Sequence, residues 1–299
     1  VGRGGQAAAV GLGAVARAGL RAATRRSSRT AVKLVALARA PVHPDEAARA
    51  LADAAGVTLA EARMRLAPEA PALLARLDPD RADAVVAALR KAGLAALAID
   101  ARVPSDKDRT VARSLALADG GARFAPRLGD PLDVAWPEVL AVLRGARAAR
   151  SDVERTEKSR SLSLGTALAT GGLKMTRTST RTVRSSEESI EQVILVYARD
   201  GRAAMLAETE LDFACLGPGM QPSSTANMIA LAGALRDRAK GAFHDERLLR
   251  LGRRSLPFLA GGEARSQTPT STRTRTDTSG SLDVLAEVMR QSLLQGLLP

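Results

Sequence analysis

The chain has 299 residues, enough for two domains, and its 45% hydrophobic and 25% charged residues are ordinary values for a folded protein. Only 2% of the residues are aromatic, which excludes a binding site built on stacked aromatic rings. One Cys and two His cannot supply an internal disulfide, a four-ligand zinc site or an iron–sulfur site. The composition still allows one kind of metal site, a magnesium or calcium ion bound by carboxylates. We expect no cofactor.

Positive charge is concentrated at the start of the chain. The net charge is +12, and residues 1–40 contribute +8 of it because they contain eight basic residues and no acid. Clustered arginines attract phosphate groups, so one alternative function is a basic surface binder of nucleic acid or of an anionic membrane. We expect residues 1–30, the leader, to be disordered, and no apolar run near 18 residues predicts a transmembrane helix. The candidate anion-binding residues of the leader are Arg17, Arg21, Arg25 and Arg26.

Residues 31–103 predict a small α/β module in the order strand, helix, helix, short apolar segment, helix, strand. Thr58 and Glu61 have the Thr-x-x-Glu spacing of a capping box, which predicts the start of the second helix. The third helix is expected to begin at Asp78, because Asp is a favoured N-cap and Pro follows it, and to end at Gly93. The flanking strands are expected at 32–38 and 94–99.

This module resembles a known family, the C-terminal domain of the bacterial ribosomal stalk protein, which shares its α/β sandwich with the adaptor of the Clp protease. The resemblance covers about residues 31–101 and is most specific in Val57-Thr-Leu-Ala-Glu-Ala-Arg63, which is similar to a Gly-Leu-Lys-Glu-Ala-Lys stretch of the family. In the family, the helix that begins here contacts translation factors through Lys residues. Ala60 replaces the first of these Lys, so the resemblance implies a protein-docking module rather than a ribosomal one. The candidate protein-binding residues are Leu59, Glu61 and Arg63, although Leu59 could equally be a core residue and Arg63 merely solvated.

Residues 110–256 predict a β-rich domain of short strands, with a helix from Asn227, or from a Ser just before it, to Lys240. Strands closed by one amphipathic helix resemble a bacterial pleckstrin-homology-like barrel, whose helix plugs an open end. The local marker of that resemblance is Trp136-Pro-Glu-Val-Leu140. The basic cluster that would bind a lipid headgroup is missing, so the resemblance implies the fold rather than lipid binding. The predicted fold class is α+β: a stalk-like α/β sandwich, a mostly antiparallel β-barrel capped by a helix, and a tethered C-terminal helix.

The stretch Thr176–Arg184 alternates Thr with Arg or Ser, so neither face of a strand formed here would be apolar. Such a strand is expected at a sheet edge or in a projecting ribbon, where its charges prevent aggregation. Arg177 and Arg181 are candidate anion-binding residues. The alternative is a solvated edge whose arginines pair across a turn with Glu187, Glu188 and Glu191.

The end of the chain predicts a linker and a helix. Residues 260–280 are polar and are expected to form a flexible linker, in which Thr270–Thr276 repeats the Thr/Arg alternation. Ser281 can cap a helix over 281–298 whose broad apolar face includes Leu285 and Met289. These two are candidate protein-binding residues, because the face must be buried either on this chain, which we expect, or in the groove of a partner.

Patterns typical of catalysis are scarce. His244, Asp245 and Glu246 form the one acid/base cluster, which leaves a cryptic hydrolase as a further alternative. We do not expect the chain to be an enzyme. The function that the sequence favours is a non-enzymatic adaptor or scaffold in the cytoplasm, which binds an unknown protein partner through the α/β module and also, as a second surface, through the tail helix.

Overall fold

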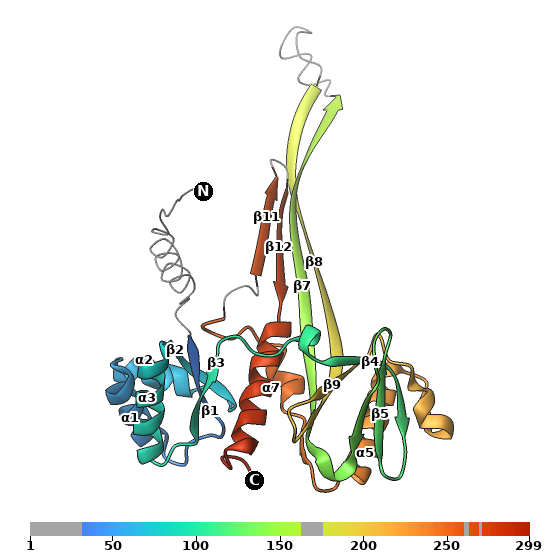
Figure 1. Cartoon of the computed structure of the whole chain (residues 1–299). Coiled ribbons are helices and arrows are strands. Elements are labelled where there is room, and N and C mark those ends of the chain that lie inside the picture. The colour runs from blue at the N-terminus through green and yellow to red at the C-terminus, as the bar shows by residue number, and fades with distance from the viewer. Residues whose placement is uncertain (1–31, 163–175, 260–262, 269–270) are drawn as a thin grey trace, which may run out of the picture.

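The structure, a computed structural model, describes residues 32–162, 176–259, 263–268 and 271–299, with side chains at all of these except 156–162, 176–180 and 263. It is an α+β protein with a small antiparallel sheet and a large curled sheet that forms a half-barrel (Figure 1). The predicted α+β class is therefore confirmed. The predicted leader lies outside the described residues.

The small sheet and three helices form the predicted α/β module, in the predicted order. The N-caps explain two of the helix starts: Thr58 Oγ1 accepts a hydrogen bond from the Glu61 backbone N–H at 3.2 Å, and Asp78 Oδ1 accepts one from Arg81 at 3.0 Å. The Glu61 side chain accepts a bond from Arg65 instead of returning to Thr58, so the capping box is only half formed. The elements are β1 (Lys33–Leu37), α1 (Pro44–Ala55), α2 (Leu59–Leu66), β2 (Ala72–Leu77), α3 (Pro79–Lys91) and β3 (Ala96–Asp100).

The module's sheet, with strand order β2-β1-β3, is buried on both faces. Val35 and Leu37 of β1 pack toward α1, α2 and α3, whereas Leu34 and Ala36 pack on the other side, against the C-terminal helix. A strand that is apolar on both faces is typical of a sheet covered on both sides. The module is therefore completed by a segment almost 200 residues further along the chain, which the sequence analysis did not predict.

A fragment of residues 32–101 is expected to fold but to self-associate. The core between its sheet and its helices lies wholly within the fragment, but its other sheet face would expose Leu34, Leu73, Leu97 and Ile99 to water. Sedimentation velocity, together with a thermal melt, measures both properties. Leu34→Thr with Leu97→Thr should reduce the association, and a strictly monomeric parent fragment would contradict the expectation.

The large sheet has the strand order β11-β12-β7-β8-β9-β4-β5-β6, with β10 parallel to β7 at its side. The described strands at its two ends, β11 and β6, do not pair, so the predicted closed barrel is not formed by the described residues. Helix α5 (Ser224–Arg238), capped by Ser223 as expected, packs into the curled sheet through Met228, Leu231 and Leu235. The strands are β4 (Thr110–Leu117), β5 (Gly121–Pro126), β6 (Leu132–Ala135), β7 (Val139–Leu162), β8 (Thr176–Ala198), β9 (Ala203–Ala207), β10 (Phe243–Asp245), β11 (Glu263–Thr268) and β12 (Ser271–Asp277).

Strands β7 and β8 continue far beyond the body as a twisted antiparallel pair (Figure 1), so the prediction of a projecting ribbon over 176–184 is confirmed. We call residues 149–162 and 176–189, together with β11 and β12, the ribbon. Strand β12 pairs with β7 along Ala149–Arg155, and β11 pairs with β12. The prediction of a flexible linker over 260–280 is therefore wrong for its described part, because a polar strand can be held by backbone hydrogen bonds that composition does not reveal.

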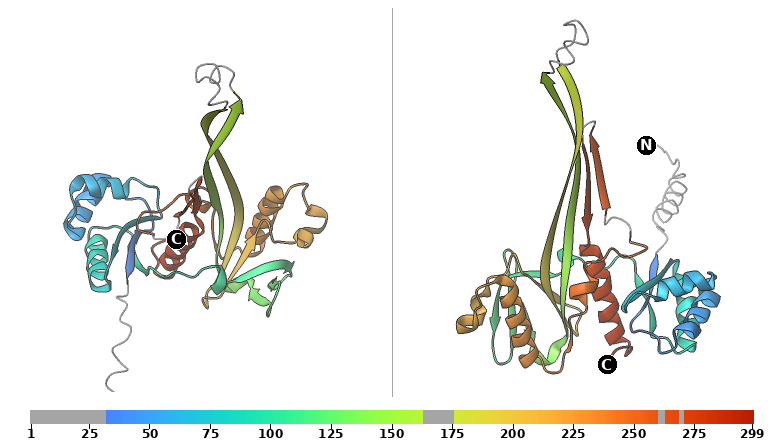
Figure 2. Two further views of the ribbon diagram at one scale, coloured as in Figure 1. Left: turned by 90° about the horizontal axis from the view of Figure 1, so that it is seen from above. Right: turned by 180° about the vertical axis from the view of Figure 1, so that it is seen from behind.

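Helix α7 (Ser279–Leu294) lies between the module and the large sheet, and the views from above and from behind agree on this placement (Figure 2). It begins at Ser279 rather than at the predicted Ser281, after Thr278, whose hydroxyl accepts a hydrogen bond from the Ala148 backbone at 2.9 Å. Its Leu285 and Met289 pack against β7 and β8. Its Val284 and Val288 pack against the module's sheet. The short helix α6 (Leu248–Leu251) packs beside it. One helix therefore supplies core to both parts of the molecule.

Candidate functional site

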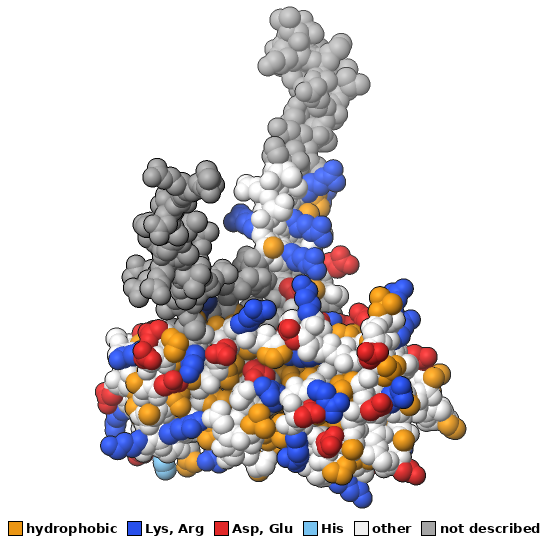
Figure 3. All heavy atoms as spheres, in the orientation of Figure 1, with side chains coloured by type: hydrophobic (Ala, Val, Ile, Leu, Met, Phe, Trp, Pro, Cys, Tyr) orange, Lys and Arg blue, Asp and Glu red, His pale blue; other side chains and the backbone are white. Residues whose placement is uncertain are grey.

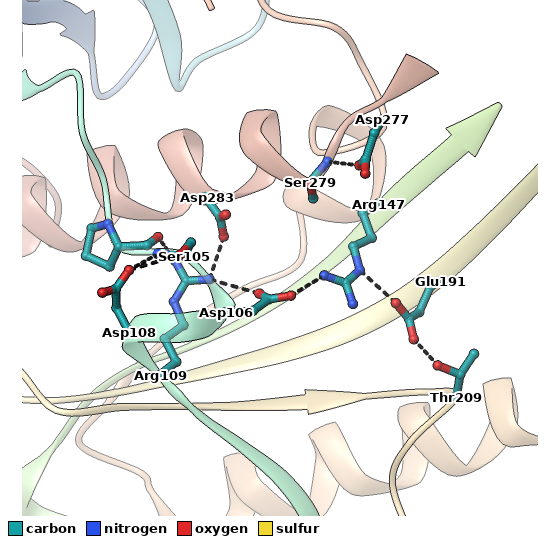
Figure 4. Close-up of polar contacts among 11 residues, drawn as sticks. Ser105, Asp106, Asp108, Arg109, Arg147, Glu191, Thr209, Asp277, Ser279 and Asp283 are labelled. Atoms are coloured by element: carbon teal, nitrogen blue, oxygen red, sulfur yellow. Dashed lines mark hydrogen bonds and ion pairs between the residues drawn. The ribbon is translucent and has the colours of Figure 1, made fainter. Parts of the chain in front are cut away.

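A network of charged side chains holds the base of the ribbon (Figure 4). Arg147 of β7 donates hydrogen bonds to Asp106, which lies in a 3₁₀ turn, at 2.6 Å and to Glu191 of β8 at 2.7 Å. Glu191 also accepts a hydrogen bond from the Thr209 hydroxyl. Because β7, β8 and the segment that holds Asp106 meet at Arg147, these contacts fix the direction in which the ribbon leaves the body.

Beside this network lies a buried ion pair between the segment before β4 and helix α7 (Figure 4). The Arg109 guanidinium, whose side chain is 1% exposed, donates to Asp283 Oδ1 at 2.5 Å and to the Pro104 carbonyl at 2.8 Å. The Asp106 carboxylate lies 3.8 Å away. Arg109 therefore joins α7 to the interdomain segment. Because its side chain is buried, water could not solvate its charge if Asp283 were removed.

Burial shifts the pKa values of two acidic groups in this region, Asp283 and Tyr197. Burial raises the pKa of the Asp283 carboxyl, against the attraction of Arg109, which favours the charged form. Burial likewise raises the pKa of Tyr197 to about 12, and its hydroxyl has no hydrogen-bond partner among the described residues. Each carboxylate of the network contacts an arginine, so the arrangement holds the fold together rather than offering a free general base.

A pocket of about 700 Å³ opens next to Asp283, between residues 101–105, residues 255–259 and the start of α7. Its charged lining residues are Arg102, Asp277 and Asp283. Asp277 accepts a hydrogen bond from the Ser279 backbone at 2.8 Å, and Asp283 is held by Arg109. Both acids of the pocket are thus occupied by structural contacts.

The predicted acid/base cluster does not come together as a site. The His244 ring contacts the Ala239 carbonyl at 3.0 Å, while Asp245 pairs with Arg247 at 2.8 Å and Glu246 with Arg236 at 3.2 Å. No group of three or more His, Cys, Asp or Glu side chains within the described ranges could hold a metal ion. Nothing in this geometry supports the hydrolase alternative.

Helix α2 carries the predicted docking residues and leaves most of its surface uncovered. Leu59 is 37% exposed, Arg63 is exposed and pairs with Asp45 at 2.9 Å, and only Ala62 of this helix is buried. Glu61 turns toward Arg65 instead. The structure adds Met64, 69% exposed, which the sequence analysis missed although it lies one turn after Ala60, on the side of the helix opposite the buried Ala62.

The tail-helix candidates are not available to a partner in this structure. Leu285 is 1% exposed and Met289 is 0% exposed, both within the core formed with β7 and β8. The apolar face of the tail helix is therefore buried on this chain, as expected, and not left for a partner.

Of the candidate anion-binding residues, only Arg181 has a side chain that the structure describes. Arg181 is exposed on β8, the Arg177 side chain is outside the description, and the four leader arginines lie outside the described residues. Glu187 and Glu188 lie on the same strand as Arg181, not across a turn from it, so the predicted pairing is wrong. Arg184 instead pairs with Glu154 of β7 at 3.2 Å.

In a comparison with known proteins, no family model, curated protein or solved structure matches the chain. In the part of the chain that the structure describes, no helix has both the length and the apolar character needed to cross a membrane.

Proposed function

We propose that the chain is a non-catalytic adaptor or scaffold that binds another protein on the outer side of α2. We call this surface the α2 face, formed by Leu59, Ala60, Arg63, Met64 and Ala67. The observation that carries the proposal is the exposure of Met64, an unbranched apolar side chain of the kind that adapts to partner surfaces. The stalk-like resemblance points to the same helix.

The chemistry of the α2 face indicates what the partner must offer. Leu59 and Met64 leave apolar area in water, and covering them would contribute about 1–2 kcal/mol each. The Arg63–Asp45 ion pair at their edge is exposed, so it can exchange its partner for a charge on the bound protein at little cost. A partner with a small apolar patch bordered by an acidic group fits this surface.

The body behind the α2 face is suited to a scaffold. Arg65, on the inner side of α2, donates to the Leu74 carbonyl at 2.8 Å and stacks on Phe258, 5.2 Å from its ring centre. Phe258 belongs to the segment that leads toward the ribbon, so α2 is tied to the rest of the molecule on its inner side. Binding on the outer side would therefore position the partner relative to the ribbon.

The test places a photo-crosslinking amino acid at Ala60 in the full chain and compares capture in cells of the source organism. We expect a discrete crosslinked protein, whose capture drops at least tenfold when Leu59→Glu and Met64→Glu are added, with an unchanged melting temperature because both side chains are at the surface. The matched control is Ile229→Glu, which changes an apolar residue on α5 whose exposure (54%) lies between those of Leu59 and Met64, and it should leave capture intact. Equal capture by all three chains would contradict the proposal.

A further inference from the structure

The two faces of the ribbon carry different electrostatics. In an antiparallel pair, directly opposed residues share a face and neighbours along a strand alternate between faces. The register pairs Arg155 of β7 with Ser271 of β12, and Val153 with Arg273. Arg155, Arg273 and Arg275 therefore project from one face, which we call the arginine face.

The residues directly opposite these three arginines on β7, β11 and β12 are uncharged, and the acids of the same face are Asp277, two residues after Arg275, and Glu187, opposite Ser151 on β8. Arg273 lies opposite Val153 and Ser266, and Arg275 lies opposite Ser151 and Ala264. Arg155, Arg273 and Arg275 are all exposed, and among the described side chains none of the three lies within ion-pair distance of a carboxylate. Arg273 and Arg275 are two residues apart on one strand, about 7 Å. Arg155 lies opposite Ser271 on the adjacent strand, about 8 Å from Arg273 and about 14 Å from Arg275.

The opposite face is neutralised, and we call it the paired face. Arg150 pairs with Asp152 at 3.0 Å, and Arg184 pairs with Glu154 at 3.2 Å. Arg265 also belongs here, since it lies opposite Thr274. The arginine face also carries Arg181 of β8, and its described acids are Asp277 and Glu187. None of Arg155, Arg273 and Arg275 forms an ion pair with a described carboxylate, whereas two of the three arginines of the paired face do. Blue side chains are prominent along the described part of the projection (Figure 3).

We propose that the arginine face binds the phosphate backbone of a duplex nucleic acid. Three arginine positions spread over about 14 Å, with Ser, Val and Ala directly opposite them, match a repeating row of phosphates, to which each guanidinium can donate two parallel hydrogen bonds. This site is independent of the α2 face and of the leader. It would give the adaptor a second ligand, which would be bound on the ribbon and away from the α2 face.

The surface favours a nucleic-acid backbone over other polyanions and over bases. A membrane-binding surface needs several large apolar or aromatic side chains to enter the bilayer boundary. The residues directly opposite the three arginines include only two apolar side chains larger than Ala, Val153 and Val183, and no aromatic one. Single-stranded binding relies on stacked aromatic side chains, and only 2% of the residues of this chain are aromatic. Four strands side by side are also about 19 Å across, wider than a major groove, so contact is with phosphates and not with base edges.

The test measures binding of a fluorescent 20-base-pair duplex of arbitrary sequence to the full-length protein over a range of salt concentrations. The arginine-face variant combines Arg155→Gln, Arg273→Gln and Arg275→Gln. The matched control combines Arg150→Gln, Arg184→Gln and Arg265→Gln, which removes the same charge from the paired face. The leader is present in every protein, so its contribution cancels in the comparison.

The arginine-face variant should lose about 2.7 from the slope of log K against log salt, as expected for three phosphate contacts, and on the order of a hundredfold in affinity at low salt. The control should change the slope by less than about 1, and the melting temperature should be unchanged in both. Equal losses in the two variants, or no loss in either, would overturn the proposal and assign binding to net charge or to the leader. Loss of binding to vesicles containing phosphatidylserine, with duplex binding retained, would also overturn it.

Discussion

Replacing Asp283 with Ala is expected to lower the free energy of unfolding by about 3–5 kcal/mol, the cost of leaving a buried charge without its partner. The Arg109 side chain is 1% exposed and cannot reach bulk water to replace the lost contact. The change should lower the melting temperature of the full chain by roughly 10 °C. Differential scanning calorimetry measures it directly.

A double variant separates the ion pair from simple packing. Arg109→Met with Asp283→Leu removes both charges and keeps the volume, so it should be clearly more stable than Asp283→Ala. If Asp283→Ala alone costs less than about 1 kcal/mol, the buried pair does not hold the two parts together.

The pH dependence of the same residue has a definite sign. Because the folded pKa of Asp283 is raised above its ordinary 3.8, the folded state binds the proton more tightly than the unfolded state does. The stabilising contribution of protonated Asp283 is thus present below pH 3.8 and is lost as pH rises through the folded pKa. The stability difference between the native chain and Asp283→Asn should fall with increasing pH across that window.

Replacing Leu285 and Met289 together with Asp should unfold the protein or leave it with little residual stability. Both side chains are buried to at least 99% between α7 and the large sheet, and each buried carboxylate would cost several kcal/mol, against a total stability that is typically about 5–15 kcal/mol. A milder Leu285→Ala should cost about 2–5 kcal/mol. Circular dichroism melts of the purified monomer provide the measurement.

Leu294→Asp is the matched control on the same helix, because Leu294 is 50% exposed and its replacement should change the melting temperature little. An unaltered melting curve for the Leu285→Asp, Met289→Asp monomer would mean that α7 does not contribute to the core in solution. In that case the apolar face of α7 would again be a candidate surface for a partner.

The sequence by itself determined the local elements of this protein. The caps at Thr58 and Asp78 act within three residues of themselves, and they place the starts of α2 and α3. The turn between β8 and β9 is equally local, because Gly201 supplies the backbone angle φ of 92° that other residues rarely adopt. The Thr/Arg alternation likewise predicted a projecting strand, since a strand with two polar faces cannot be buried.

Only the tertiary structure decided which distant segments meet. Strand pairing depends on backbone hydrogen bonds that are the same for every residue type, so nothing in the composition of 260–280 distinguished β12 from a linker. The side on which α7 is buried, the pairing of Arg109 with Asp283 and the common face of Arg155 and Arg273 are contacts between residues more than 100 positions apart. Such contacts are fixed by packing and register, which no local pattern encodes.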